Sequence, residues 1–171
     1  MFWTRSPLEI AAEFGGFVLA HSALISSLLG DGELICPYAV IEAQGQRQSV
    51  EYEEESQVEA IEQGKADFEK YKDTADIWAF AREGLFSDPG SPDKTDVILI
   101  SSWAPGMTEW LGIIQRFNPA SSGNFRLIGD PMIYVEGNEA VGKQATKLAA
   151  AVGRGIKNRG TAWDSWKAHD A

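Results

Sequence analysis

The sequence has few of the residues from which common catalytic and metal sites are built. Among its 171 residues there is one cysteine, Cys36, and there are two histidines, His21 and His169. A single cysteine excludes an intramolecular disulfide and, with it, the class of small secreted scaffolds stapled by disulfides. One cysteine and two histidines also fall short of the four ligands of a structural zinc site. We therefore expect no metal site and no cofactor.

A basic leader and an uninterrupted apolar run are also missing. The most apolar stretch, 14–29, follows Glu9 and Glu13 rather than basic residues, and His21 and three serines interrupt it. A signal peptide begins with basic residues, and a membrane-spanning helix needs about 20 apolar residues. Neither pattern fits, so the sequence predicts a cytoplasmic protein that has no membrane partner.

Basic residues are fewer than acidic ones, and the acids are unevenly distributed. Fifteen Lys and Arg stand against 25 Asp and Glu, a net charge of −10, which disfavours nucleic acid as a partner. Residues 31–76 hold thirteen acids and four bases, whereas residues 143–167 hold six bases and one acid, Asp164. Either the basic stretch folds against the acidic segment and neutralises it, or the acidic segment is a negative face for a basic protein partner.

The residue patterns predict one α+β domain covering 1–171, with a mostly antiparallel sheet of 5–6 strands. Ser6 and Glu9 form a capping box that begins a helix reaching about Leu29, and Ser56 and Glu59 form a second one. The strands are expected at 34–43, 47–53, 77–81, 96–103, and 125–128 with 132–135, while 110–117 fits either a strand or a short helix. The order is α-β-β-α-β-β-β-β-α, which lacks the regular alternation of a doubly wound sheet.

Two features near the ends of the chain could serve contacts with other molecules. The first helix is apolar on most sides, which indicates either burial in this chain or an interface in a homo-oligomer. At the other end, Asn138 is expected to begin a terminal helix that ends near Val152, and 157–171 is expected to be a basic tail. This tail contains Trp163 and Trp166, and Trp3 lies near the opposite terminus.

One segment matches a nucleotide-binding pattern. Residues 137–144, Gly-Asn-Glu-Ala-Val-Gly-Lys-Gln, resemble the phosphate-binding loop G-x-x-x-x-G-K-[ST] of P-loop nucleotide hydrolases. The resemblance implies that Gly137 and Gly142 wrap a phosphate and that Lys143 reaches its outer oxygens. Gln144 departs from the pattern because it lacks the hydroxyl that holds magnesium, and Glu139 puts a negative charge where phosphate would sit. The alternative is that Asn138 caps a helix and that Glu139, in the first turn of this helix, complements its dipole.

His21 is the first candidate for acid–base chemistry, because imidazole titrates near neutral pH and the other histidine is third from the end. Cys36 could join it as a nucleophile, although a free cysteine on a core strand is more often a small buried hydrophobe. No other residue stands out as catalytic.

We expect a non-enzymatic binding protein of the inhibitor or immunity type, whose acidic face at 51–62 binds a basic protein such as a nuclease toxin. The expected contact residues are Glu51, Glu53, Glu54, Glu55, Glu59 and Glu62. The alternative is an enzyme or small-molecule-binding protein with a pocket near His21, between the first helix and the sheet.

Overall fold

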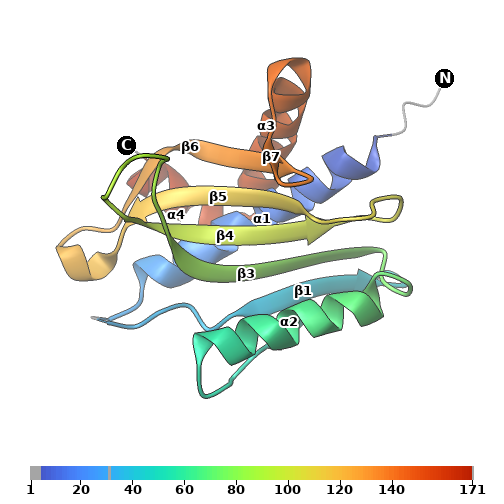
Figure 1. Cartoon of the computed structure of the whole chain (residues 1–171), viewed down its shortest axis with the longest axis horizontal. Helices are drawn as coiled ribbons and strands as arrows, with labels where there is room; N and C mark the ends of the chain where they lie inside the picture. The colour runs from blue at the N-terminus through green and yellow to red at the C-terminus, as the bar shows by residue number, and fades with distance from the viewer. Residues whose placement is uncertain (1–4, 31, 171) are drawn as a thin grey trace.

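Helices cover both faces of one seven-stranded sheet in this chain (Figure 1). The structure is a computed structural model and describes residues 5–30 and 32–170, so Trp3 and Asp31 lie outside the described residues. The elements in chain order are α1 (Pro7–Ser27), β1 (Tyr38–Ala43), β2 (Gln46–Glu51), α2 (Gln57–Tyr71), β3 (Ile77–Phe86), β4 (Thr95–Trp103), β5 (Leu111–Asn118), the 3-10 turn Ala120–Ser122, β6 (Arg126–Val135), β7 (Asn138–Glu139), α3 (Gly142–Lys157) and α4 (Thr161–His169). The predicted α+β class is confirmed.

The strands lie in the order β2-β1-β3-β4-β5-β6-β7, and every neighbouring pair is antiparallel. The ambiguous segment 110–117 is a strand, and the sheet has one strand more than expected because β7 adds two residues at the edge. The predicted turn between β1 and β2 is present: Gln44 and Gly45 both have positive φ, 54° and 77°. Such a two-residue turn matches the twist of a hairpin, so it fixes the register of these strands.

Both predicted capping boxes begin helices. The backbone N–H of Glu9 donates to Ser6 Oγ at 3.2 Å, and the N–H of Glu59 donates to Ser56 Oγ at the same distance. These bonds satisfy backbone donors that the first turn of a helix leaves free.

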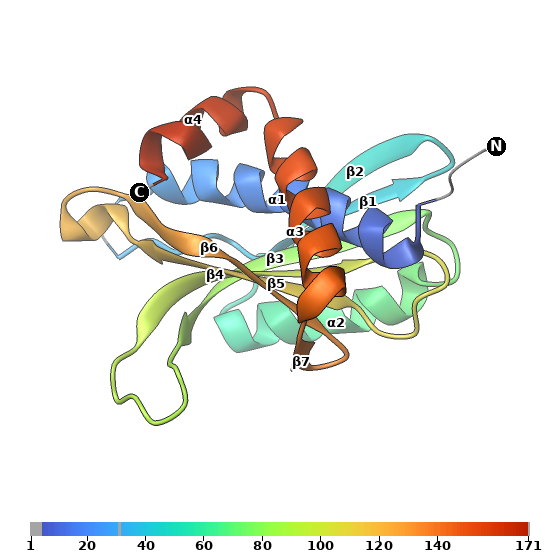
Figure 2. The ribbon, with the colours of Figure 1, turned by 90° about the horizontal axis from the view of Figure 1, so that it is seen from above.

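The sheet separates the helices into two groups. α1, α3 and α4 lie on one face, and α2 lies on the other (Figure 2). In Figure 1 the viewer looks onto the α2 face, where the helix follows β1 and leaves the strands β4 and β5 without a helix in front of them. Aromatic side chains fill the space under α2, with Phe68 packed on Trp78 at a ring-centroid distance of 4.9 Å.

The apolar surface of α1 is explained by burial within this chain. Eleven of its 21 residues are buried, and it packs against α3, β3 and β4. Among the described residues it is the one helix long and apolar enough to cross a membrane. Its most apolar 18-residue stretch has a mean hydropathy of 1.4, and 56% of that stretch is buried. A core helix meets the same test, and α1 occupies the core. Burial of α1 within the chain accounts for its apolar residues without an oligomer. A homo-oligomer through α1 therefore stays a prediction.

The structure differs from the expected C-terminal arrangement in three places. α3 begins at Gly142 rather than at Asn138. Glu136 and Gly137 have positive φ and form a turn, after which Asn138 of β7 pairs with Val135 of β6. α3 also continues past Val152 to Lys157. The segment expected to be a basic tail then forms α4, a fourth helix, whose Trp166 is buried against the main core.

α1 and α3 cross so closely that their backbones touch. A Cβ atom added to Gly16 would overlap the carbonyl of Val152, and one added to Gly155 would overlap the carbonyl of Glu13. In contrast, a Cβ atom added to Gly153, on the same helix α3, would meet nothing within 4 Å. Gly16 and Gly155 are thus the residues that allow this contact.

We expect Gly16→Ala to lower the free energy of unfolding by about 2 kcal/mol or more, because no flexible side chain can move aside. Gly153→Ala is the matched control and should raise the free energy of unfolding by about 0.5–1 kcal/mol, since alanine is the better helix former. Urea denaturation of both variants measures these changes. Equal stabilities of the two variants would contradict the close contact.

Candidate functional site

The six glutamates expected to contact a partner lie along one continuous stretch of chain, from the end of β2 to α2. Glu51 pairs with Tyr38, which packs against α1, so the Glu51 side chain points to the α1 face of the sheet. Glu51 ends β2, Glu53, Glu54 and Glu55 follow in the loop, and Glu59 and Glu62 lie on α2. All six are exposed. No ion pair within residues 5–30 and 32–170 involves any of them. We call this set of six side chains the acidic face.

Tyr52 fixes the loop of the acidic face to α2. Its side chain is only 4% exposed, and its hydroxyl donates a hydrogen bond to Asp67 Oδ2 at 2.7 Å. Its backbone N–H donates to the carbonyl of Pro37 at 2.9 Å. Burial, together with the carboxylate of Asp67, raises the pKa of the Tyr52 phenol far above its ordinary value, so the hydroxyl stays protonated and remains a donor. Tyr52 therefore attaches the loop that carries Glu53, Glu54 and Glu55 to α2.

The basic residues of α3 and α4 do not cover the acidic face. These helices lie on the opposite side of the sheet from α2 (Figure 2). Arg154 pairs with Glu13 of α1 at 3.3 Å, and Lys167 pairs with Asp164 at 3.5 Å. Lys157 lies over the ring of Trp163. These cations of α3 and α4 thus contact residues on the α1 side of the sheet, and they do not neutralise the acidic face.

His21, the first candidate for catalysis, is half-buried on α1. Arg159 Nη2 lies 2.7 Å from its Nδ1, so the guanidinium donates and the ring proton is assigned to Nε2. Its ring also meets the ring of Tyr38 edge-on at 5.9 Å. Burial, with a contribution from the positive charge of Arg159, lowers the pKa of His21 below its ordinary value. The ring lines none of the five cavities described for residues 5–30 and 32–170.

Cys36 does not form a nucleophile–base pair with His21. It precedes β1 instead of lying on a core strand, and its Sγ lies 3.6 Å from the carbonyl of Tyr52. Burial and the neighbouring charges of Glu51 and Glu53 raise the pKa of the thiol. These acidic neighbours are the opposite of the electropositive setting that activates a thiolate. The thiol therefore stays protonated, and a protonated thiol is a poor nucleophile.

The lowered pKa of His21 predicts how stability depends on pH. The unfolded chain, with an ordinary histidine pKa of 6.5, binds this proton more readily than the folded chain. Stability should be full above that pH and should decline as the pH falls below it, whereas His21→Gln should show a flatter decline. Chemical denaturation between pH 7.5 and 5 (roughly the range over which an unperturbed histidine titrates) measures this, with His169→Gln as the control. Parallel profiles for wild type and His21→Gln would refute the assignment.

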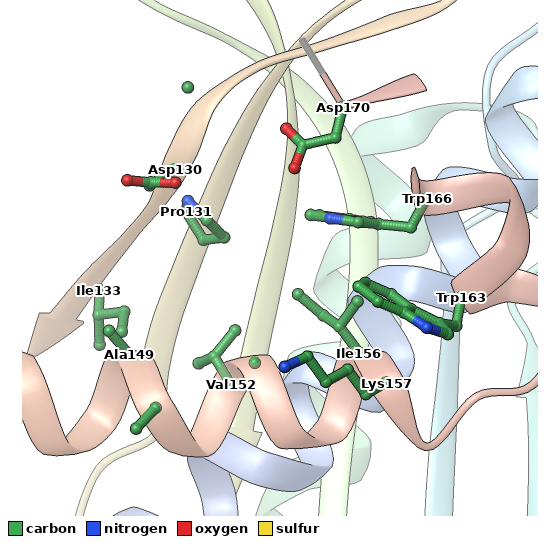
Figure 3. A pocket seen from close by; sticks show the side chains of 13 residues that line it. Asp130, Pro131, Ile133, Ala149, Val152, Ile156, Lys157, Trp163, Trp166 and Asp170 are labelled. Carbon is green, nitrogen blue, oxygen red and sulfur yellow. The ribbon is translucent and has the colours of Figure 1, made fainter. Parts of the chain in front are cut away.

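A cavity of about 470 Å³ lies between β6, α3 and α4 (Figure 3). Ile133, Val152 and Ile156 give it an apolar lining, and Trp163 and Trp166 of α4 add aromatic surface. In Figure 3 the carboxylate of Asp170 lies above the ring of Trp166, and that of Asp130 lies on the opposite side of the cavity, beside Pro131; both residues are exposed. Sequence reasoning noted the two tryptophans but missed the cavity, because their segment was expected to be a tail.

A second hollow, which we call the groove, lies on the α2 face of the sheet. It has a volume of about 280 Å³, and its lining comes from α2, β3, β4, β5 and β6. Lys65, Arg82, Trp110, Gly112 and Tyr134 are among its lining residues. A further cavity of about 470 Å³ adjoins it and shares the last three of these residues. None of these residues was predicted as part of a site.

The segment that resembles a phosphate-binding loop does not form a single loop. Gly137 lies in the turn between β6 and β7, and Gly142 begins α3, so the strand β7 lies between the two glycines. Lys143 is exposed on the first turn of α3. Within the part of the chain that the structure describes, no three His, Cys, Asp or Glu residues cluster as a metal site would require. Comparison of the chain with protein-family models, curated proteins and solved structures finds no match.

Proposed function

We propose that this chain is a cytoplasmic binding protein that captures a basic protein partner through the acidic face. The observation that carries the proposal is the state of the six glutamates: all are exposed, and none has a cation partner among the described residues. Like charges held close together repel one another, and a partner's lysines and arginines relieve that repulsion on binding.

The rigidity of the acidic face also supports binding. The hydrogen bond from Tyr52 to Asp67 and the cap from Ser56 hold the loop against α2 before any partner arrives. A surface that is already ordered loses less conformational entropy on binding, so more of the contact energy becomes affinity. The alternative of a catalytic pocket at His21 has weaker support, because the ring is held by Arg159 and lines no described cavity.

We expect the triple variant Glu53→Lys, Glu54→Lys, Glu55→Lys to lose capture of a basic partner, with an affinity at least about a hundredfold lower, because attraction becomes repulsion at three contacts. The measurement is affinity capture from a lysate of cells that make the protein, followed by titration calorimetry with the captured protein. Wild-type affinity should also fall as salt concentration rises.

A control variant separates the acidic face from total charge. Asp93→Lys, Asp130→Lys, Glu139→Lys changes three exposed acids outside the acidic face, and none of these three makes an ion pair within the described part of the chain. This control should keep its partner. Unchanged capture by the Glu53, Glu54 and Glu55 variant, or equal losses in both variants, would overturn the proposal.

A further inference from the structure

The groove on the α2 face has a floor of small residues between aromatic walls. Cross-strand pairing places Phe80, Ser101, Gly112 and Tyr134 in one row across β3, β4, β5 and β6. Successive members of such a row point to the same face of a sheet. Phe80 and Tyr134 thus lie at the two ends of the row. Between them lie only the small side chain of Ser101 and Gly112, which has no side chain. The row leaves space for a flat group, with Trp110 also lining the groove.

The groove also holds two cations that the chain does not neutralise. Arg82 lies half-buried on β3 beside this row, and Lys65, which is exposed, lines the groove from α2. Neither forms an ion pair with a described residue. Arg116, on the same face of the sheet, shows the usual arrangement: it pairs with Asp88 at 2.6 Å and lies over the ring of Phe86. Arg159 is also partly buried without an ion pair, but its guanidinium donates to His21 Nδ1 at 2.7 Å. Arg82 has no ion pair among the described residues.

Burial of an unpaired guanidinium costs free energy, since water is removed and no anion replaces it. Burial indeed lowers the pKa of Arg82, but an arginine keeps its charge at physiological pH. Trp78 adds a second unsatisfied donor, because its buried indole N–H has no hydrogen-bond partner within the described residues and its side chain lines the same groove. The groove therefore offers donors and positive charge, and none of its described lining residues is an Asp or Glu that could match them.

We propose that the groove binds a small aromatic carboxylate, with the carboxylate at Arg82 and Lys65 and the ring against Trp110 and Tyr134. A guanidinium fork matches the planar carboxylate with two parallel hydrogen bonds. The orientation follows from charge: Glu69 and Glu109 line the adjoining cavity, so the anionic end lies away from them, at Arg82. A volume of about 280 Å³ is that of a site for a ligand of one or two rings. This site is independent of the acidic face and its partner.

The charged residues that line the cavity in Figure 3 do not indicate a ligand in the same way. Asp130, Asp170 and Lys157 are exposed there, so water solvates them and no ligand is needed to offset burial. The half-buried cation distinguishes the groove from that cavity.

The test is calorimetric titration of the full chain with 2-naphthoate and with 2-naphthamide, which has the same ring system without the charge. We expect saturable binding of the carboxylate, and affinity for the amide at least about tenfold lower, because the amide cannot accept two charge-assisted bonds from Arg82. Equal affinities, or no saturable binding of the carboxylate, would overturn the proposal.

Two variants locate the site. Arg82→Met removes the guanidinium and keeps an apolar stem, and Gly112→Val fills the floor of the row. The nearest atom to a Cβ at Gly112 is Tyr134 Cβ at 3.6 Å, an ordinary contact, and valine suits a strand. Both should reduce 2-naphthoate affinity at least about tenfold with an unchanged circular dichroism spectrum. Arg126→Met, an exposed arginine outside the groove, should bind as wild type does. Wild-type affinity in Arg82→Met and Gly112→Val, or an equal loss in Arg126→Met, would place the ligand elsewhere and refute the groove.

Discussion

The backbone contact between α1 and α3 is the constraint on which the rest of the fold depends. Gly16 and Gly155 allow each helix to reach the carbonyls of the other, and Gly15 lets α1 lie directly on Ser102 and Ile113 of the sheet. α1 is thereby held between the sheet and α3, and α4 follows α3 on the same side of the sheet. Three helices therefore cover one face of the sheet, and α2 alone covers the other face.

This division of the helices decides where both proposed sites lie. One helix of 15 residues cannot cover a seven-stranded sheet, so the part of the α2 face over β4 and β5 is left for the groove. The same division keeps the cations of α3 and α4 away from the acidic face. The α2 residues of the proposed acidic face and the proposed site for an aromatic acid thus lie on the same side of the sheet, and the two proposed sites involve different residues.

Local signals made most of the fold predictable from the sequence. The capping boxes at Ser6 and Ser56 and the turn at Gln44 act through neighbours within three residues, so they could be recognised without tertiary information. The end of α3 could not, because Gly153 and Gly155 lower helix propensity and favoured a stop at Val152. The helix continues there because Gly155 is the residue that fits against α1, a contact between distant parts of the chain.

The candidate sites were predictable to different degrees for the same reason. The acidic face could be inferred because its glutamates are close together in the sequence, although its separation from the basic helices required the topology. Arg82 carried no signal, since one arginine in a strand is ordinary until its surroundings are seen to lack a carboxylate. Sequence alone could propose clusters of charge, and the structure was needed to find a missing counter-charge.

The position of the basic helices opposite the acidic face has a consequence for the approach of another molecule. Residues 143–167, which form most of α3 and α4, hold six bases and one acid, and these helices lie across the sheet from α2, so charge is unevenly distributed between the two faces of the sheet. A chain with unevenly distributed charge experiences a torque in the field of a charged body, and at physiological ionic strength that field acts over about 8 Å. A basic protein that comes within this distance would turn the α2 side toward itself before any atoms touch.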